Sequence, residues 1–278
     1  MPMRDVASRS APTDGSRELT PSEHLPALLR VEDVSISFGG IKAVDQVSFT
    51  LDRGCCGIIG PNGAGKTTLL DALAGVLVPR AGRILLDGQD LTRRSSAWRA
   101  QHGIRRTFQR HQAFGWLTVE ENLLVACEWR GRGWRILADL LAARSSRRRR
   151  EAHLERIEHV LELCGLLSVR DQRAATLPIG QVRLMEFARA IVDEPRLLLL
   201  DEPTSGLGPA DTERLGSVVS ELTSKGECAA ILVEHDLDFV VGLCDRLMVL
   251  TSGQVLTSGD PAEVCRDPRV VSAYIGKA

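Results

Sequence analysis

The stretch "CCGIIGPNGAGKTTLLDALAGVL" at residues 55–77 decides the fold. It begins with a short apolar run that is typical of a buried strand, and it ends with apolar residues at helical spacing from Leu69 to Val76. Between the two lies "GPNGAGKT" at residues 60–67, which has the form G-x-x-x-x-G-K-[ST] in the setting of strand, loop and helix that this motif requires. The stretch therefore predicts a phosphate-binding loop that opens a helix.

The chemistry of this loop explains its residue types. Glycines permit backbone conformations in which successive N–H groups point inward at a phosphate, and the start of a helix adds its positive dipole end. We expect Lys66 to reach the β- and γ-phosphates and Thr67 to ligate Mg²⁺. A glycine-rich turn with an accidental Lys-Thr pair is the alternative, which the strand and helix around the loop disfavour. The expected nucleotide-binding residues are Gly60, Pro61, Asn62, Gly63, Ala64, Gly65, Lys66, Thr67 and Thr68.

A second run, "LLLLDEP" at residues 197–203, supplies the other half of such a site. Four successive leucines predict a strand that is buried on both faces, as in the centre of a parallel sheet. Asp201 then emerges at the carboxyl end of the strand, where open α/β sheets bind their ligands. We expect Asp201 to hold Mg²⁺, through water, and Glu202 to polarise an attacking water. Taken alone, the run is also compatible with a strand that leads into a solvated turn.

The rest of the chain predicts a mixed architecture. Residues 1–27 are rich in Ser, Pro and charge, which favours a disordered tail. From Leu28 the pattern changes to β-rich runs, and "GRILLDGQDL" at 82–91 is hairpin-like. Residues 118–175 look wholly helical, and a further helix is expected to begin near Ile179. This order favours an α/β fold with a parallel central sheet, an antiparallel β part and a helical insertion.

Bulk composition sets outer limits on function. The 278 residues are 44% hydrophobic and 26% charged, as in an ordinary globular protein, and the net charge of −1 gives no reason to expect a nucleic-acid partner. No run approaches the roughly 20 apolar residues of a membrane span, and the N-terminus lacks the apolar core of a secretion signal. The seven cysteines show no metal spacing and favour buried, reduced thiols. We therefore expect a cytoplasmic protein.

Taken together, these motifs resemble those of the nucleotide-binding subunits of ABC transporters. "GPNGAGKTT" is similar to the Walker A motif of that family and "LLLLDEP" to its Walker B motif, while "TFQ" with Gln109 resembles its Q-loop and "VEHD" with His235 its switch. The resemblance covers residues 28–278. It implies a P-loop NTPase with a RecA-like core, an antiparallel β subdomain and a helical subdomain at about residues 110–192, with ATP and Mg²⁺ as cofactors.

The resemblance also assigns roles to single residues. It implies that Glu202, His235 and Gln109 are catalytic, and that Thr67, Gln109 and Asp201 form the metal site. Phe38 stands 22 residues before the phosphate loop, where the family stacks an aromatic ring on adenine. A lone histidine is more often structural and a lone phenylalanine more often core, so both assignments depend on their spacing from the other motifs.

The family's L-S-G-G-Q signature is altered in this chain. Leu177, Pro178, Ile179, Gly180 and Gln181 stand in its place. In the family this motif faces the γ-phosphate bound by the opposite subunit, whereas Pro178 offers neither a hydroxyl nor an N–H. The loss of one charge-assisted hydrogen bond costs about 1.5–3 kcal/mol. Proline suits a first helical turn and the helix amides remain, so we predict an altered but working motif. Gly208 likewise stands where the family commonly has Asp.

Several stretches resemble ATP-binding subunits of importers for branched-chain amino acids, namely the L-P-x-G-Q signature, "SFGGIKAVDQVSF", "RTFQ", "LTVEENLLVA" and "VVSAYIG". The resemblance implies a bacterial importer in which a second ATP-binding subunit, two permeases and a periplasmic binding protein are partners. It places the chain at the cytoplasmic face of the inner membrane.

Other functions stay open at this point. Importers of urea or short amides use similar ATPases, and a catalytically poor regulatory cassette would account for Pro178 and Gly208. A soluble ABC ATPase acting on nucleic acid or the ribosome is disfavoured by the single cassette and the lack of sustained heptads. The run "RSSRRRR" at 144–150 fits either a solvated helix start or contact with anionic lipid, and Trp129 and Trp134 fit either packing or an interface.

Overall fold

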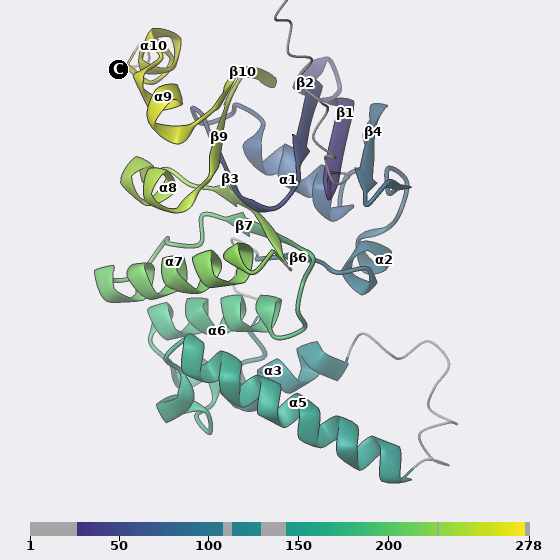
Figure 1. Cartoon of the computed structure of the whole chain (residues 1–278), viewed down its shortest axis with the longest axis vertical. Coiled ribbons are helices and arrows are strands. Elements are labelled where there is room, and N and C mark those ends of the chain that lie inside the picture. The colour runs from purple at the N-terminus through teal and green to yellow at the C-terminus, as the bar shows by residue number, and fades with distance from the viewer. Residues whose placement is uncertain (1–26, 108–112, 129–142, 227, 276–278) are drawn as a thin grey trace, which may run out of the picture.

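The computed structural model describes residues 27–107, 113–128, 143–226 and 228–275. Its centre is a six-stranded sheet with the strand order β10-β9-β3-β8-β7-β6, visible behind the helices in Figure 1. The five strands from β9 to β6 are parallel, and only β10 runs antiparallel, beside β9. The bounds are β3 Gly54–Ile59, β6 Ile104–Arg106, β7 Leu197–Asp201, β8 Ala229–Val233, β9 Arg246–Thr251 and β10 Gln254–Gly259. The predicted parallel central sheet is thus confirmed.

A second, four-stranded antiparallel sheet has the order β2-β1-β4-β5. Its strands are β1 Leu29–Phe38, β2 Ile41–Leu51, β4 Ala81–Leu86 and β5 Gln89–Asp90. The predicted hairpin at 82–91 is confirmed, with Asp87 and Gly88 forming its turn at φ 46° and 74°. Left-handed backbone of this kind suits the short Asp-Gly connection between two antiparallel strands.

In Figure 1, the helices α6, α3 and α5 lie below α7, whereas α8, α9 and α10 lie above it and α1 lies beside the antiparallel sheet. Their bounds are α1 Lys66–Ala74, α2 Ser96–Gln101, α3 Val119–Glu128, α5 Ala143–Leu163, α6 Ile179–Ile191, α7 Pro209–Ser224, α8 Leu237–Leu243, α9 Pro261–Arg266 and α10 Pro268–Ile275. The helix predicted near Ile179 is confirmed at that residue.

Two helical expectations need correction. Residues 118–175 are not wholly helical, because the chain beyond α5 turns at Gly165 with φ 68° and then forms only short 3₁₀ turns at Leu167–Val169 and Ala174–Thr176. The helix of the phosphate loop also ends earlier than the apolar spacing predicted. Gly75 caps it at φ 76°, which leaves Val76 outside the helix and 55% exposed.

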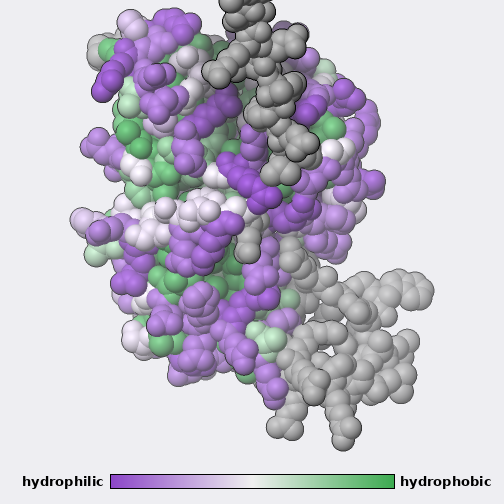
Figure 2. All heavy atoms as spheres, in the orientation of Figure 1, coloured by the Kyte–Doolittle hydropathy of each residue, from purple (hydrophilic) through white to green (hydrophobic). Residues whose placement is uncertain are grey.

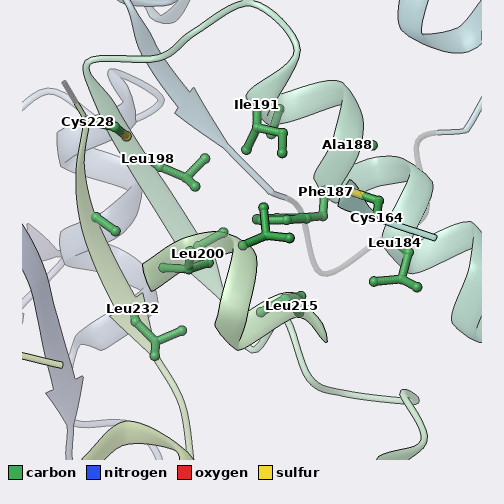
Figure 3. Packing of buried hydrophobic residues seen from close by; sticks show 14 of the residues in the cluster. Cys164, Leu184, Phe187, Ala188, Ile191, Leu198, Leu200, Leu215, Cys228 and Leu232 are labelled. Atoms are coloured by element: carbon green, nitrogen blue, oxygen red, sulfur yellow. The ribbon is translucent and has the colours of Figure 1, made fainter. Parts of the chain in front are cut away.

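The core explains why four leucines follow one another in β7. Leu198 and Leu200 belong to the apolar cluster beneath the sheet, whereas Leu197 and Leu199 belong to the cluster on the side of α1. Figure 3 shows Leu198 and Leu200 facing Phe187 of α6. Alternate residues of a strand point to opposite faces, and each fully buried leucine contributes roughly 1.5–3 kcal/mol to stability. The prediction of a strand buried on both faces is therefore confirmed.

The surface is mainly polar. In Figure 2 hydrophilic residues cover most of the visible face, and the apolar colour gathers in smaller patches, one of them around α8 and α9. Within the described ranges, no helix combines the length and the apolar character that crossing a membrane requires. Six of the seven cysteines are buried and Cys265 is half-buried, all with free thiols, as expected. Across 27–107, 113–128, 143–226 and 228–275, no cluster of ligand side chains could hold a metal on its own.

Candidate functional site: the phosphate-binding loop and its surroundings

The loop between β3 and α1 has a backbone that only glycine can supply. Gly60, Gly63 and Gly65 have φ values of 151°, 78° and 100°. A Cβ atom on Gly60 would lie 2.1 Å from the carbonyl oxygen of Leu250, and one on Gly65 would lie 2.2 Å from that of Ala43. The glycines therefore serve both the positive φ of the loop and the close approach of neighbouring strands.

Lys66 lies inside the loop, at the first position of α1. Its ammonium donates to the carbonyl oxygens of Gly60 at 2.6 Å and Pro61 at 3.1 Å. Burial lowers the pKa of Lys66, while the carboxylates of Glu202 and Asp201 act in the opposite direction. The lysine is thus held against the backbone that is expected to surround a phosphate. Thr67, the next residue, is exposed at the start of the same helix.

Asp201 ends β7 with its side chain fully buried. One carboxylate oxygen, Oδ2, accepts a hydrogen bond from Arg106 at 2.9 Å, whereas Oδ1 is buried and has no hydrogen-bond partner among the described residues. Burial raises the pKa of Asp201, and the bond from Arg106 counteracts that rise. An orphaned carboxylate oxygen and a threonine hydroxyl are hard oxygen donors of the kind that Mg²⁺ prefers, so Asp201 and Thr67 fit the expected metal.

Glu202 and His235 meet directly at the ends of β7 and β8. The Nε2 atom of His235 lies 3.0 Å from Oε1 of Glu202, and both side chains are partly exposed. Glu202 adopts φ 48°, and its N–H donates to the carbonyl oxygen of Val233 at 2.9 Å. This strained backbone, unusual for a residue with a side chain, turns the chain sharply after the strand. Two of the three residues that the resemblance assigned to catalysis, Glu202 and His235, are therefore in contact.

Two charged residues that the sequence analysis did not single out lie beside the site. Arg106, the last residue of β6, pairs with Asp201. Glu234 is 4% exposed and accepts hydrogen bonds from the backbone N–H groups of Thr204 at 2.9 Å and His235 at 3.0 Å. Both residues stand inside the quoted stretches "RTFQ" and "VEHD". For Glu234 the available signal was a charged residue directly after an apolar strand, whereas Arg106 lies within the short strand Ile104–Arg106 and had no such signal.

The structure describes Phe38 but not Gln109. Phe38 ends β1 opposite Ile41 and is 53% exposed, which excludes the alternative that it is a core residue. Ala43, two residues beyond Ile41, touches the phosphate loop, so this hairpin lies close to it. Gln109 lies outside the described residues, as do Trp129, Trp134 and the side chains of the arginine run at 144–150.

The altered signature forms the start of α6. Pro178 is the N-cap residue, and its carbonyl oxygen accepts the N–H of Val182 at 3.0 Å. Ile179 is 54% exposed, and a Cβ on Gly180 would lie 3.2 Å from Oδ2 of Asp211 in α7. Leu177 packs against the core and Gln181 is half-buried. Gly208 is the N-cap of α7 and provides no side-chain cap.

The end of β3 carries a glycine loop with an inward lysine, and the end of β7, two strands away in the same parallel sheet, carries a buried carboxylate. This arrangement defines a P-loop nucleotide-binding fold. More narrowly, the chain belongs to the ABC transporter family. A family model described as ABC transporter matches residues 44–205, and another, described as branched-chain amino acid ATP-binding cassette transporter, matches residues 254–278.

Named relatives extend this result over most of the chain. This chain is 38% identical over 252 residues to the high-affinity branched-chain amino acid transport ATP-binding protein LivG of Escherichia coli, and the match covers 90% of this chain and 98% of LivG. It is 36% identical, with the same coverage, to BraF of Pseudomonas aeruginosa, which bears the corresponding description. A nucleotide-free ATP-binding cassette from an ABC transporter has a TM-score of 0.77 at 34% identity, covering 90% of this chain and all of that one. The predicted fold class is thus confirmed.

Proposed function

We propose that this chain is the ATP-binding and ATP-hydrolysing subunit of a bacterial importer of branched-chain amino acids. Support for the substrate comes from the match at residues 254–278 and from the names of LivG and BraF. Importers of urea or short amides, and a soluble cassette acting on nucleic acid, find no such support.

The contact between His235 and Glu202 at 3.0 Å is the observation that carries the chemistry. Glu202 polarises the attacking water. His235 contacts Glu202 in this structure and donates its N–H toward the γ-phosphate when ATP is bound. Lys66 and the loop amides bind the β- and γ-phosphates, and the ring of Phe38 stacks on adenine. Thr67, Asp201 and Gln109 would hold Mg²⁺, which would supply positive charge beside the phosphates. The chain retains Lys66, Asp201, Glu202 and His235, which argues against a catalytically poor cassette.

The partners follow from what the chain leaves exposed. The start of α6, with Ile179 on the surface, completes the site of a second ATP-binding subunit through its helix amides. A cavity of about 560 Å³ lies between α2, β6, α3 and α6, lined by Ala97, Phe114, Val125 and Arg189 among others. An apolar segment of a permease docks there, at the cytoplasmic face of the membrane, and a periplasmic binding protein delivers the substrate. The division into a tail at 1–27 and a cassette at 28–278, with a helical subdomain at about 110–192, belongs to the same proposal.

Uptake in cells tests the proposal. Cells that carry the wild-type chain or Glu202→Gln are given labelled leucine, isoleucine and valine, with labelled urea in parallel. We expect Glu202→Gln to abolish branched-chain uptake alone, because ATP still binds but the attacking water is no longer polarised. Glu213→Gln, a change of an exposed glutamate in α7, is the matched control and leaves uptake unchanged.

Two results would count against the proposal in different ways. Loss of urea uptake with intact leucine uptake would retain the ATPase and change its substrate. Full branched-chain uptake with Glu202→Gln, at normal protein levels, would remove Glu202 from catalysis.

A further inference from the structure

Arg106 lies between two carboxylates that come from different parts of the chain. Its guanidinium donates to Oδ2 of Asp201 at 2.9 Å and forms an ion pair with Asp71 of α1. The Arg106 side chain is 8% exposed, and that of Asp201 is fully buried. Arg106 therefore connects the strand that leads to the Q-loop with the Walker B strand and with the helix of the phosphate loop.

The backbone holds these groups in register. The N–H of Thr107 donates to the carbonyl oxygen of Leu199 at 3.0 Å, and the N–H of Asp201 donates to the Thr107 hydroxyl at 3.4 Å. β6 pairs in parallel with β7 up to Arg106 and Leu199. The contact between Arg106 and Asp201 is thus set by the central sheet and does not depend on a free surface side chain.

Charge explains what the contact does. A carboxylate that is removed from water is stable in its ionised form only when an opposite charge or strong donors compensate it. Here the opposite charge is the guanidinium of Arg106, which lies 2.9 Å from Oδ2 of Asp201. The guanidinium occupies only Oδ2, so Oδ1 keeps its capacity to accept.

We propose that Arg106 is the resident counter-ion of Asp201, which holds this buried carboxylate in place while no metal is bound and thereby moderates the affinity of the site for Mg²⁺. The inference rests on the proposed function, since it requires Asp201 to take up the metal. Arginine suits the role because its planar fork reaches two carboxylates at once, whereas lysine carries a point charge. Arg106 touches no reacting atom, and it is a positioning residue.

A stability cycle tests the ion pair without any nucleotide. Thermal unfolding of the whole chain in metal-free buffer is compared for wild type, Arg106→Gln, Asp201→Asn and the double variant. We expect Arg106→Gln to lower Tm, because it leaves a buried carboxylate uncompensated, and Asp201→Asn to restore at least half of that loss. Arg105→Gln is the matched control. Arg105 pairs with Asp193 instead, so its effect on Tm is not restored by Asp201→Asn.

A magnesium titration tests the effect on the metal. Binding of a fluorescent ATP analogue is followed while the Mg²⁺ concentration is raised. We expect the half-saturating Mg²⁺ concentration to fall roughly tenfold in Arg106→Gln, since a unit positive charge next to the metal ligand is removed. Arg106→Lys keeps the charge and stays close to wild type, as does Arg105→Gln. Metal-free binding of the analogue is unchanged in all of them.

The possible results distinguish a failure of this inference from a failure of the proposed function. An unchanged or raised Mg²⁺ requirement in Arg106→Gln would overturn the inference, as would a Tm loss that Asp201→Asn does not restore. If Arg106→Gln does not fold, a folded double variant supports the inference and an unfolded one overturns it. A wild-type chain that binds no ATP analogue would overturn the proposed function, while the stability cycle still reports on the ion pair.

Discussion

At the scale of single residues, the buried carboxylate of Glu234 links two segments of the site by hydrogen bonds. Its carboxylate accepts hydrogen bonds from Thr204, three residues after Asp201, and from His235. The loop that follows Glu202 and the segment that carries His235 are therefore fixed to one buried group. We expect the 3.0 Å contact between His235 and Glu202 to depend on this arrangement.

Glu234→Gln tests that dependence. The amide group of glutamine cannot accept from both segments, so one charge-assisted hydrogen bond worth about 1.5–3 kcal/mol is lost. We expect ATP turnover to fall at least about tenfold while ATP affinity changes less than about threefold, since Lys66 is untouched. Steady-state turnover and equilibrium binding separate the two. Thr204→Val removes only the hydroxyl bond to Glu234, so we expect a smaller loss of turnover. Equal turnover in Glu234→Gln and wild type would show that Glu234 does not position His235 and Glu202.

Lys66→Ala gives a prediction for binding. Loss of the ammonium removes a charge-assisted contact to the phosphates worth about 1.5–3 kcal/mol, which corresponds to a roughly ten- to more than hundredfold weaker ATP affinity. Equilibrium binding of ATP measures it. Lys225→Ala removes an exposed lysine that pairs with Glu221 and leaves the affinity unchanged. Equal affinities of Lys66→Ala and wild type would exclude Lys66 as a phosphate ligand.

The contacts of Arg106 and Glu234 illustrate what the sequence could not predict. Motif spacing placed Lys66, Asp201, Glu202 and His235 correctly at adjacent strand ends, because parallel strands bring their carboxyl ends together. It could not show that Arg106 pairs with a residue 95 positions away, since that contact follows from the order of strands in the sheet.

At the scale of elements, α1 depends on a buried arginine at its carboxyl end. Arg99 of α2 is 1% exposed and donates to the carbonyl oxygens of Ala72 at 2.6 Å and Leu73 at 2.8 Å. It also donates to Leu91 at 2.6 Å, and burial lowers its pKa to about 10. These bonds satisfy the last carbonyls of a helix whose C-cap is glycine.

Arg99→Met should therefore destabilise the fold. The buried carbonyl oxygen of Leu73 loses this donor, and those of Ala72 and Leu91 keep only a backbone N–H. At about 1–3 kcal/mol for each lost bond, we expect the free energy of unfolding to fall by about 3 kcal/mol or more. Urea denaturation measures this change. Arg93→Met, at an exposed position nearby, should stay within about 0.5 kcal/mol of wild type. A comparably small effect of Arg99→Met would show that water replaces the guanidinium.

Element boundaries were predicted well where apolar periodicity and a stop signal coincided. β7 and α6 appear at their expected positions, because one consists of adjacent leucines and the other follows proline. The helical prediction failed over residues 164–175, where apolar residues such as Leu166 pack against the core beside 3₁₀ turns. Periodicity reports burial, and it does not distinguish a helix from a turn that buries the same side chains.

At the scale of the whole molecule, the thiols report on the integrity of the core. Burial raises the pKa values of Cys56, Cys164 and Cys228 to about 12, from an ordinary value of 9.0. At pH 8 a thiol reagent should modify only the half-buried Cys265 in the folded chain and all seven cysteines in denaturant. Rapid modification of several thiols in the folded chain would contradict the packed core.

The same thiols make the free energy of unfolding depend on pH. The unfolded chain loses their protons near pH 9 and the folded chain only near pH 12, so the unfolded state binds fewer protons in between. The stabilising contribution is complete below pH 9 and is lost as the pH rises from 9 toward 12. Urea midpoints at pH 8 and pH 10 should therefore differ, with the lower midpoint at pH 10. Cys164→Ala should reduce this difference, and an unchanged difference would assign it to other groups.

The phosphate loop is hydrogen-bonded to a segment that lies far from it in the sequence. The N–H of Gly253, in the turn between β9 and β10, donates to the carbonyl oxygen of Ala64 at 3.0 Å, and its carbonyl oxygen accepts from Asp45 of β2 at 2.8 Å. During synthesis, residues 60–67 thus leave the ribosome long before the segment that buttresses them. The loop reaches its final shape only once the growing chain has passed residue 253, so an early-terminated polypeptide carries the whole nucleotide-binding motif without its final support.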